Sequence, residues 1–185
     1  MDSYVTTTDI LSRLEALGNS PLDHGRLEMI VCRPAIEQRK VLECAELDLL
    51  EGLVGDSWRA RGSSRTEDGS PNFEAQITIM NSRIIQVLAQ DRSRWPLAGD
   101  QLYIDLDLSI ENLPPGQRIA IGTAVLEVSA TPHTGCAKFT ERFGHDAIRF
   151  VNSAEGRQGR RRGLNARVIE PGTICVGDIV SKIGE

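Results

Sequence analysis

Gln101-Leu-Tyr-Ile-Asp-Leu-Asp-Leu108 is the stretch that decides the fold class of this chain. Aliphatic residues occupy its even positions, while Gln101, Tyr103 and two aspartates occupy its odd positions. Side chains of a β-strand point alternately to opposite faces, so this period of two predicts a strand with one buried face. Shorter segments with strand-like patterns lie on both sides of it in the sequence.

The neighbouring segments also favour strands. Pro114-Pro-Gly-Gln117 predicts a turn, and a hairpin of 119–121 and 124–128 is expected directly after it. The other expected strands open and close the domain, and they are 27–32, 39–49, 164–169, 172–176 and 179–183. Within 39–49 the apolar positions change parity, which indicates a β-bulge.

Three short helices are predicted, over residues 10–17, after a cap at Asn81 or Ser82, and over residues 146–152. Many short strands with glycine and proline turns, and few helices, indicate a mostly-β fold that is either a barrel or a sandwich. We expect residues 1–24 to form a helical extension and residues 25–185 to form the β domain.

Composition excludes several classes of protein. With 185 residues, 40% hydrophobic and 25% charged, the chain suits one soluble domain with a sizeable core. A net charge of -5 argues against a nucleic-acid-binding protein, whose surface should be basic. We expect no membrane span, because no apolar run reaches about 18 residues. The start Met-Asp-Ser-Tyr lacks a signal-peptide pattern, so we expect a cytoplasmic protein.

The chain has four cysteines, and their spacing matches no zinc or redox motif. In a cytoplasmic protein we expect all of them to stay reduced. Cys32 and Cys175 lie in apolar runs and are predicted to pack in strands, and Cys44 resembles them. Cys136 alone lies on a predicted turn among polar neighbours.

That turn is Thr131-Pro-His-Thr-Gly-Cys-Ala-Lys-Phe-Thr140. A nearby cation or histidine favours the thiolate, which is the form of cysteine that attacks and that binds metals. Cys136, flanked by His133 and Lys138, is therefore a candidate reactive centre. Lys138 would hold the thiolate and His133 would move a proton. The alternatives are a cysteine that packs as a small hydrophobe and a histidine that bonds to backbone.

Arginines gather after residue 156, although the whole chain is acidic. Arg157, Arg160, Arg161 and Arg162 are interleaved with glycines, and Gly163 and Asn165 follow. A guanidinium matches phosphate bidentately, and glycines let backbone amides approach the same anion. We predict an anion site of Arg160, Arg161, Arg162, Gly163 and Asn165 close to Cys136. A solvated charged face is the alternative.

The segment 59–72 is long, polar and without a periodic pattern. Loops of this length inside a domain are usually functional lids or disordered segments, and we leave both interpretations open.

Several of these motifs together resemble the MOSC domain family, named for the C-terminal part of molybdenum cofactor sulfurases. The pieces that match are Glu51-Gly-Leu-Val-Gly-Asp56, the glycine–cysteine turn at Cys136, Arg162-Gly-Leu-Asn-Ala166 and the closing Pro171-Gly…Val-Gly-Asp178. The resemblance runs from about Gly25 to Ile183. It implies a MOSC-type β-barrel with a few short helices.

The resemblance also implies a function. Cys136 would carry sulfur to molybdenum or bind it directly as a metal ligand, and the arginine cluster with Asp56 would bind the molybdopterin cofactor. The enzyme would be a sulfurtransferase or a molybdenum-cofactor oxidoreductase. No pyridoxal phosphate domain of the larger sulfurases fits in this chain, so a partner protein, such as a sulfur or electron donor or a molybdoenzyme, is expected.

Two alternatives remain open. The first is a non-catalytic module that binds a phosphorylated or pterin ligand, which should tolerate serine at Cys136. The second, again by resemblance, is a molybdenum-dependent reductase of N-hydroxylated compounds.

Overall fold

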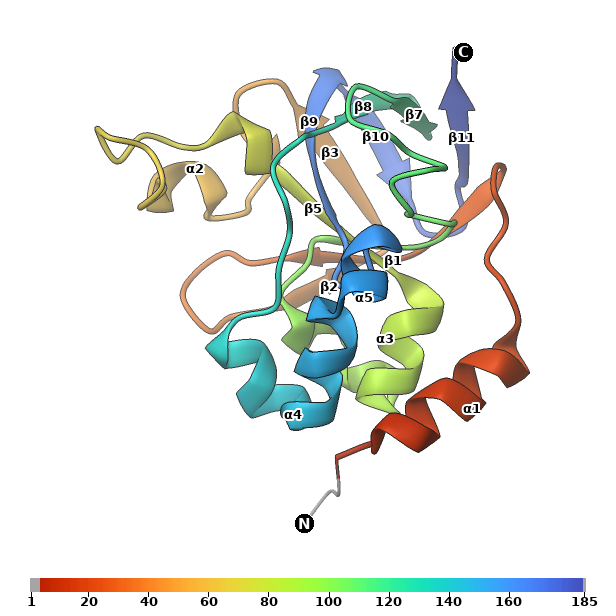
Figure 1. Cartoon of the computed structure of the whole chain (residues 1–185). Helices are drawn as coiled ribbons and strands as arrows, with labels where there is room; N and C mark the ends of the chain where they lie inside the picture. Colours follow the sequence, from red (N-terminus) through yellow and green to blue (C-terminus); the bar gives the residue numbers. More distant parts are fainter. Residues whose placement is uncertain (1–3, 185) are drawn as a thin grey trace.

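Seven strands close into a β-barrel in the computed structural model, which describes residues 4–184. In order around the barrel they are β11 (Ile179–Ile183), β7 (Arg118–Ile121), β8 (Ala124–Val128), β9 (Leu164–Glu170), β5 (Ile77–Asn81), β6 (Leu102–Asp105) and β1 (Gly25–Cys32). Pairing of β11 with β1 closes the ring. β5 and β6 run parallel, whereas the other neighbours in the ring are antiparallel (Figure 1).

A second sheet of three strands packs against the barrel. It consists of β10 (Gly172–Cys175), β3 (Cys44–Asp48) and β4 (Gly52–Leu53), while β2 (Lys40–Leu42) extends the barrel sheet beside β1. The single bulged strand predicted over 39–49 is therefore wrong. The chain breaks at Glu43 and passes from one sheet to the other, which explains the change of parity.

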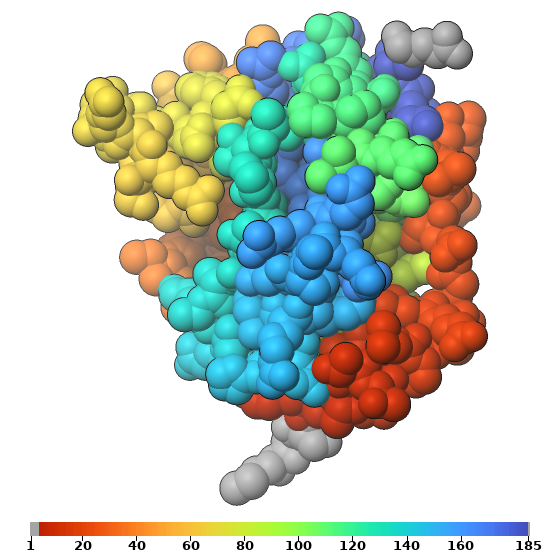
Figure 2. All heavy atoms as spheres, viewed as in Figure 1, coloured from red at the N-terminus to blue at the C-terminus, as the bar shows by residue number. Residues whose placement is uncertain are grey.

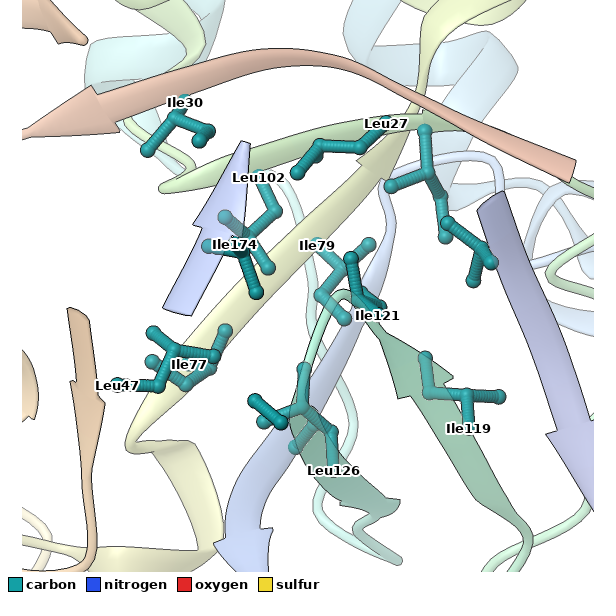
Figure 3. Packing of buried hydrophobic residues seen from close by; sticks show 14 of the residues in the cluster. Leu27, Ile30, Leu47, Ile77, Ile79, Leu102, Ile119, Ile121, Leu126 and Ile174 are labelled. Carbon is teal, nitrogen blue, oxygen red and sulfur yellow. The ribbon is translucent and has the colours of Figure 1, made fainter. Parts of the chain in front are cut away.

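Aliphatic side chains fill the space between the two sheets. Figure 3 shows Leu47 and Ile174 of the small sheet beside Ile77, Leu102 and Leu126 of the barrel. Leu102, Ile104, Leu106 and Leu108 all point into this cluster, as their alternation predicts. Burial of one such side chain contributes roughly 1.5–3 kcal/mol.

Helices cover the outer face of β1, β5 and β6, where a second buried cluster lies. Met29, Val31, Met80 and Tyr103 point outward from these strands into it. In Figure 1 most of the helices gather on this side of the barrel. The helices are α1 (Thr7–Leu17), α2 (Trp58–Arg61), α3 (Ser82–Ala89), α4 (Ala137–Asn152) and α5 (Ala154–Gln158), with 3-10 turns η1 (Phe73–Ala75) and η2 (Arg92–Ala98).

The mostly-β barrel with short helices is confirmed, with differences in several elements. The predicted elements omit β4, β5, α2 and α5, and the third predicted helix begins too late. α4 starts at Ala137 and is kinked at Gly144, where φ is +89°, so the predicted helix over 146–152 is its second half. The division at Gly25 stays a prediction, and α1 packs against the rest with Ile10 fully buried. None of the described helices is long and apolar enough to cross a membrane.

The closing Val176-Gly-Asp178 turn has a structural function. Gly177 donates its N–H to the carbonyl of Leu27, and Leu27 donates its N–H to the carbonyl of Asp178. The Asp178 carboxylate accepts from the N–H of Cys175 at 2.7 Å. The turn therefore attaches the last strand to β1 at the seam of the barrel.

Two of the four cysteines form a disulfide, which corrects the expectation that all are reduced. Cys44 and Cys175 face each other in the register of β3 and β10, with Cα atoms 4.0 Å apart. They are 131 residues apart in sequence, so no local motif could have shown the pair. Cys32 is buried in β1, as predicted, and Cys136 is free and exposed.

We predict that the Cys44→Ser/Cys175→Ser double variant is less stable than the parent protein by about 2–4 kcal/mol, because the bridge restricts a long loop in the unfolded chain. Urea unfolding without reductant measures this difference. With reductant, the two proteins should unfold at the same midpoint. A difference that persists with reductant would attribute the loss to packing instead.

Candidate functional site

The segment 129–136 crosses the front of the molecule between β8 and α4. Two asparagines hold it in place. Asn165 of β9 donates its Nδ2–H to the carbonyl of Thr131 at 3.0 Å, and Asn152 accepts the N–H of Gly135 at 3.0 Å. A Cβ at Gly135 would lie 2.2 Å from Ile148 Cδ1, so a larger residue there would displace the end of the Ile148 side chain.

Cys136 is the N-cap residue of α4. Its backbone is extended, its carbonyl accepts the N–H of Thr140 at 3.1 Å, and its side chain makes no capping hydrogen bond. The thiol is exposed and free. The structure thus leaves Cys136 available for a ligand, at the point where segment 129–136 enters the helix.

His133 belongs to a buried polar group. Its Nε2 lies 2.7 Å from Oδ1 of Asp100, and the other carboxylate oxygen accepts from Nη1 of Arg162, also at 2.7 Å. Asp100 is fully buried, and the Arg162 guanidinium stacks over the ring of Phe139 at 4.8 Å. Arg162 Nε is buried without a hydrogen-bond partner among the described residues.

The charges of this group follow from its burial. Burial opposes ionisation of Asp100, but Arg162 and His133 outweigh it, and the pKa of the carboxyl is lowered. Burial and the nearby Arg162 lower the pKa of His133 and outweigh the attraction of Asp100. His133 is therefore neutral near pH 7. Because a carboxylate can only accept, Nε2 carries the proton and Nδ1 is the basic nitrogen.

Asp56, the last residue of the Gly-Leu-Val-Gly-Asp motif, is also buried. It binds the guanidinium of Arg33 through both oxygens at 2.9 Å and accepts the N–H of Trp58. Arg33 Nη1 also donates to the carbonyl of Gly99 at 2.9 Å. Asp56 was predicted to bind cofactor; in the structure it positions Arg33.

Two hollows adjoin at Arg33, Arg61 and Gly99, which line both of them. Their volumes are about 530 and 450 Å³. One also contains His133 and Asn165, and the other also contains Cys136. We call the two together the arginine groove. Figure 2 shows it as a recess between the yellow region and the teal segment 129–136.

Unneutralised positive charge gathers in this groove. Burial and the neighbouring arginines Arg142 and Arg33 lower the pKa of Arg39, and burial and Arg33 lower that of Arg61. Neither Arg39 nor Arg61 forms an ion pair within residues 4–184. A bound anion would offset the repulsion among these arginines, since guanidinium pairs strongly with phosphate and carboxylate.

One wall of the groove comes from segment 59–72, the long polar loop for which the sequence allows a lid or a disordered segment. The segment is ordered by its own hydrogen bonds, including Ser63 N–H to the carbonyl of Gly69 at 3.3 Å. A Cβ at Gly62 would lie 2.2 Å from that same carbonyl oxygen. The segment therefore contributes Arg61 and Arg65 to the wall of the groove.

The structure brings some of the predicted site residues together and separates others. Cys136, His133 and Asn165 line the groove. Lys138 also lines it, but its ammonium group pairs with Glu37 at 2.8 Å. Glu37 also binds Arg142, and Lys138 is 64% exposed, so it is a poor candidate to hold the Cys136 thiolate.

The predicted arginine cluster lies outside the arginine groove. Arg160 donates to the carbonyl of Leu113, and Arg161 lies over the ring of Phe150 at 4.3 Å. Neither lines the arginine groove. Gly163 has a φ of +107°, and a Cβ there would lie 2.2 Å from the carbonyl of Ile79. Glycine at this position lets the chain pack closely against the backbone of Ile79.

Sequence reasoning missed Arg33, Arg39, Arg61 and Asp100. Arg33 and Arg39 follow β1, Arg61 ends α2, and Asp100 follows η2, so only the fold brings them together. The Arg-Ala-Arg at 59–61 was visible, but nothing in it distinguishes Arg61 from Arg59.

Residues 72–181, more than half of the chain, match the MOSC domain. The chain therefore belongs to the MOSC domain family. No curated protein matches the chain in sequence.

Solved structures share the fold at low sequence identity. The YuaD protein of Bacillus subtilis superposes with a TM-score of 0.65 at 17% identity, over 85% of this chain and 94% of that one. YiiM of Escherichia coli gives 0.56 at 18% identity, over 86% and 70%. YiiM of Geobacillus stearothermophilus gives 0.52 at 12% identity, over 89% and 75%.

We predict that His133 makes the protein less stable in mild acid. The unfolded chain takes up a proton near the ordinary histidine pKa of 6.5, whereas the folded protein resists it because the pKa of His133 is lowered. Stability should therefore fall as pH drops below about 6.5, by at most about 1.4 kcal/mol per pH unit for one proton.

Urea unfolding of wild type and His133→Asn between pH 7.5 and 5 measures this slope. The variant should show a smaller loss of stability over this range. The matched control is His145→Asn, at an exposed position of α4. Equal slopes in wild type and His133→Asn would contradict the prediction.

Proposed function

We propose that this protein binds a molybdopterin-type cofactor in the arginine groove, with Cys136 as the sulfur ligand to its molybdenum or as the carrier of sulfur to it. The observation that carries the proposal is that the exposed thiol of Cys136 and the unneutralised Arg39 and Arg61 line one groove. Membership of the MOSC family supports this choice of cofactor.

The residues present fit this cofactor. A thiolate is a soft ligand suited to a thiophilic metal, and guanidinium groups suit the phosphate of the pterin. No group of three or more histidine, cysteine or acidic residues within the described chain could hold a metal by itself. The cofactor would therefore bring most of the metal's ligands, and the protein would add the thiolate.

When bound, the cofactor supplies a redox-active metal centre. Arg39 and Arg61 bind and orient its anionic end, and Arg33 is held rigid behind them by Asp56. His133 can take up a proton at Nδ1, because Asp100 fixes the N–H on Nε2. A partner protein would donate the sulfur or the electrons.

We predict that iodoacetamide at neutral pH alkylates Cys136 well ahead of the other cysteines in the native, unreduced protein. Cys136 is exposed, whereas Cys32 is buried and its pKa is raised by burial and by Asp56. Cys44 and Cys175 are bonded to each other. Peptide mass spectrometry after timed quenching gives the rates. Equal rates at Cys32 and Cys136 would contradict the accessible thiol.

We further predict that Cys136→Ser retains the fold but loses molybdenum or sulfur when purified from cells that make the cofactor. Metal analysis and mass spectrometry of the intact protein give the readout, with Cys32→Ser as the control. A serine variant that keeps both the pterin and molybdenum would favour the non-catalytic binding module over the sulfur ligand.

Arg61→Ala should weaken binding of inorganic phosphate by about tenfold or more, because it removes a charge-assisted contact. The matched control is Arg59→Ala, on the same helix, where the side chain pairs with Glu51 outside the groove. Arg161→Ala should also leave binding unchanged. Calorimetric titration measures the phosphate affinity of the three variants. If only Arg161→Ala weakened binding, the anion site would lie at the cluster around residues 160–162 and not in the groove.

A further inference from the structure

A second cavity, of about 440 Å³, lies on the other side of segment 129–134 from the arginine groove. Figure 2 shows a recess between this teal segment and the light blue helix α5. His133 lines both this cavity and the groove, so the segment forms a partition between them. The cofactor proposed above occupies the groove and not this cavity.

The wall of the cavity is largely apolar. Ile110, Pro115, Pro132, Val151 and Leu164 line it, together with the backbone of Gly156 and Gly163. Val151 and Leu164 are buried, at 1% and 2% exposure. Small-molecule sites typically combine such an apolar wall with a few polar groups that fix orientation.

The charged groups of the cavity are all cationic. Arg157, Arg160 and Arg162 line it, and no acidic residue is among the described residues that do so. Asp100 neutralises Arg162, but Arg160 has the carbonyl of Leu113 as its hydrogen-bond acceptor, at 2.5 Å. Burial lowers the pKa of Arg160. An arginine stays charged at neutral pH, so positive charge remains beside the apolar wall.

The position of Arg160 is set by the backbone. Its φ is +43°, which is unusual for a residue other than glycine. Its N–H donates to the carbonyl of Arg157, and its own carbonyl accepts the N–H of Gly163 at 2.7 Å. Arg157, near the end of α5, and Arg160, in this tight turn, line the same cavity, whereas Arg161 lies over Phe150.

We propose that this cavity is a second ligand site, which takes a small carboxylate with an apolar body, such as an aryl carboxylate. The body packs against Val151 and Leu164, and the carboxylate binds Arg157 and Arg160. An apolar wall favours the hydrocarbon part, and the guanidinium fork favours the planar carboxylate over a neutral amide. The site requires no cofactor in the groove.

Benzoate and benzamide test the proposal, because they differ in charge and little in shape. Calorimetric titration of the cofactor-free protein should show that benzoate binds at least about tenfold more tightly than benzamide. Arg157→Gln/Arg160→Gln should remove this preference. Arg161→Gln is the matched control and should keep it. The backbone hydrogen bonds that hold the turn, from Arg160 N–H to the Arg157 carbonyl and from Gly163 N–H to the Arg160 carbonyl, do not involve the substituted side chains.

A second variant tests the location without touching the charges. Ala130 is exposed and lines the cavity, so Ala130→Trp should fill it and abolish benzoate binding. Ala16→Trp, at an exposed position of α1, is the control. Circular dichroism checks that both variants fold.

Three results would overturn the proposal. In the first, the wild-type protein does not bind benzoate. In the second, it binds benzamide as tightly as benzoate. In the third, Arg61→Ala loses benzoate binding while Ala130→Trp keeps it. The last would place the ligand in the arginine groove. Molybdenum retention, measured on the same variants, tests the proposed cofactor separately, because Arg157→Gln/Arg160→Gln should leave it unchanged.

Discussion

The buried carboxylate of Asp100 is the interaction on which the rest of the site depends. It joins Arg162, from the turn before β9, to His133, from the segment after β8. The two residues before it contribute as well, since the carbonyls of Ala98 and Gly99 accept from Arg162 and Arg33. Removing one partner of such a buried pair typically costs about 3–5 kcal/mol. One short stretch thus orients two guanidiniums and one imidazole.

Much of the barrel could be predicted from the sequence, because most strands have one face in the core and therefore alternate. The hairpin of β7 and β8 and the closing strands were found in this way. β5 was missed for a physical reason. It is buried on both faces, between the barrel interior and the helices, so the alternation of Ile77, Thr78 and Ile79 breaks at Met80, which packs against the helices. The disulfide was missed because strand register, which no local pattern reveals, brings its cysteines together.

The candidate site could be predicted in part. Cys136, His133 and Asn165 come from one motif and the strand beside it, and all three line the arginine groove. The arginines after residue 159 lie outside this groove: Arg160 and Arg162 line the neighbouring cavity with Arg157, and Arg161 does not. The turn at Arg160 sends three successive side chains to a carbonyl, an aromatic ring and a buried carboxylate. The arginines of the groove come from separate elements, and only the closed barrel assembles them.

The seam between β1 and β11 affects how the barrel closes during synthesis of the chain. β1 is made early and β11 late, and contacts between segments far apart in sequence form slowly. Until β11 is available, the barrel is a curved sheet with the edges of β1 and β7 unpaired. Unpaired edges invite pairing with other chains. Mispairing with other chains therefore competes with folding between synthesis of the first strand and docking of the Val176-Gly-Asp178 turn on Leu27.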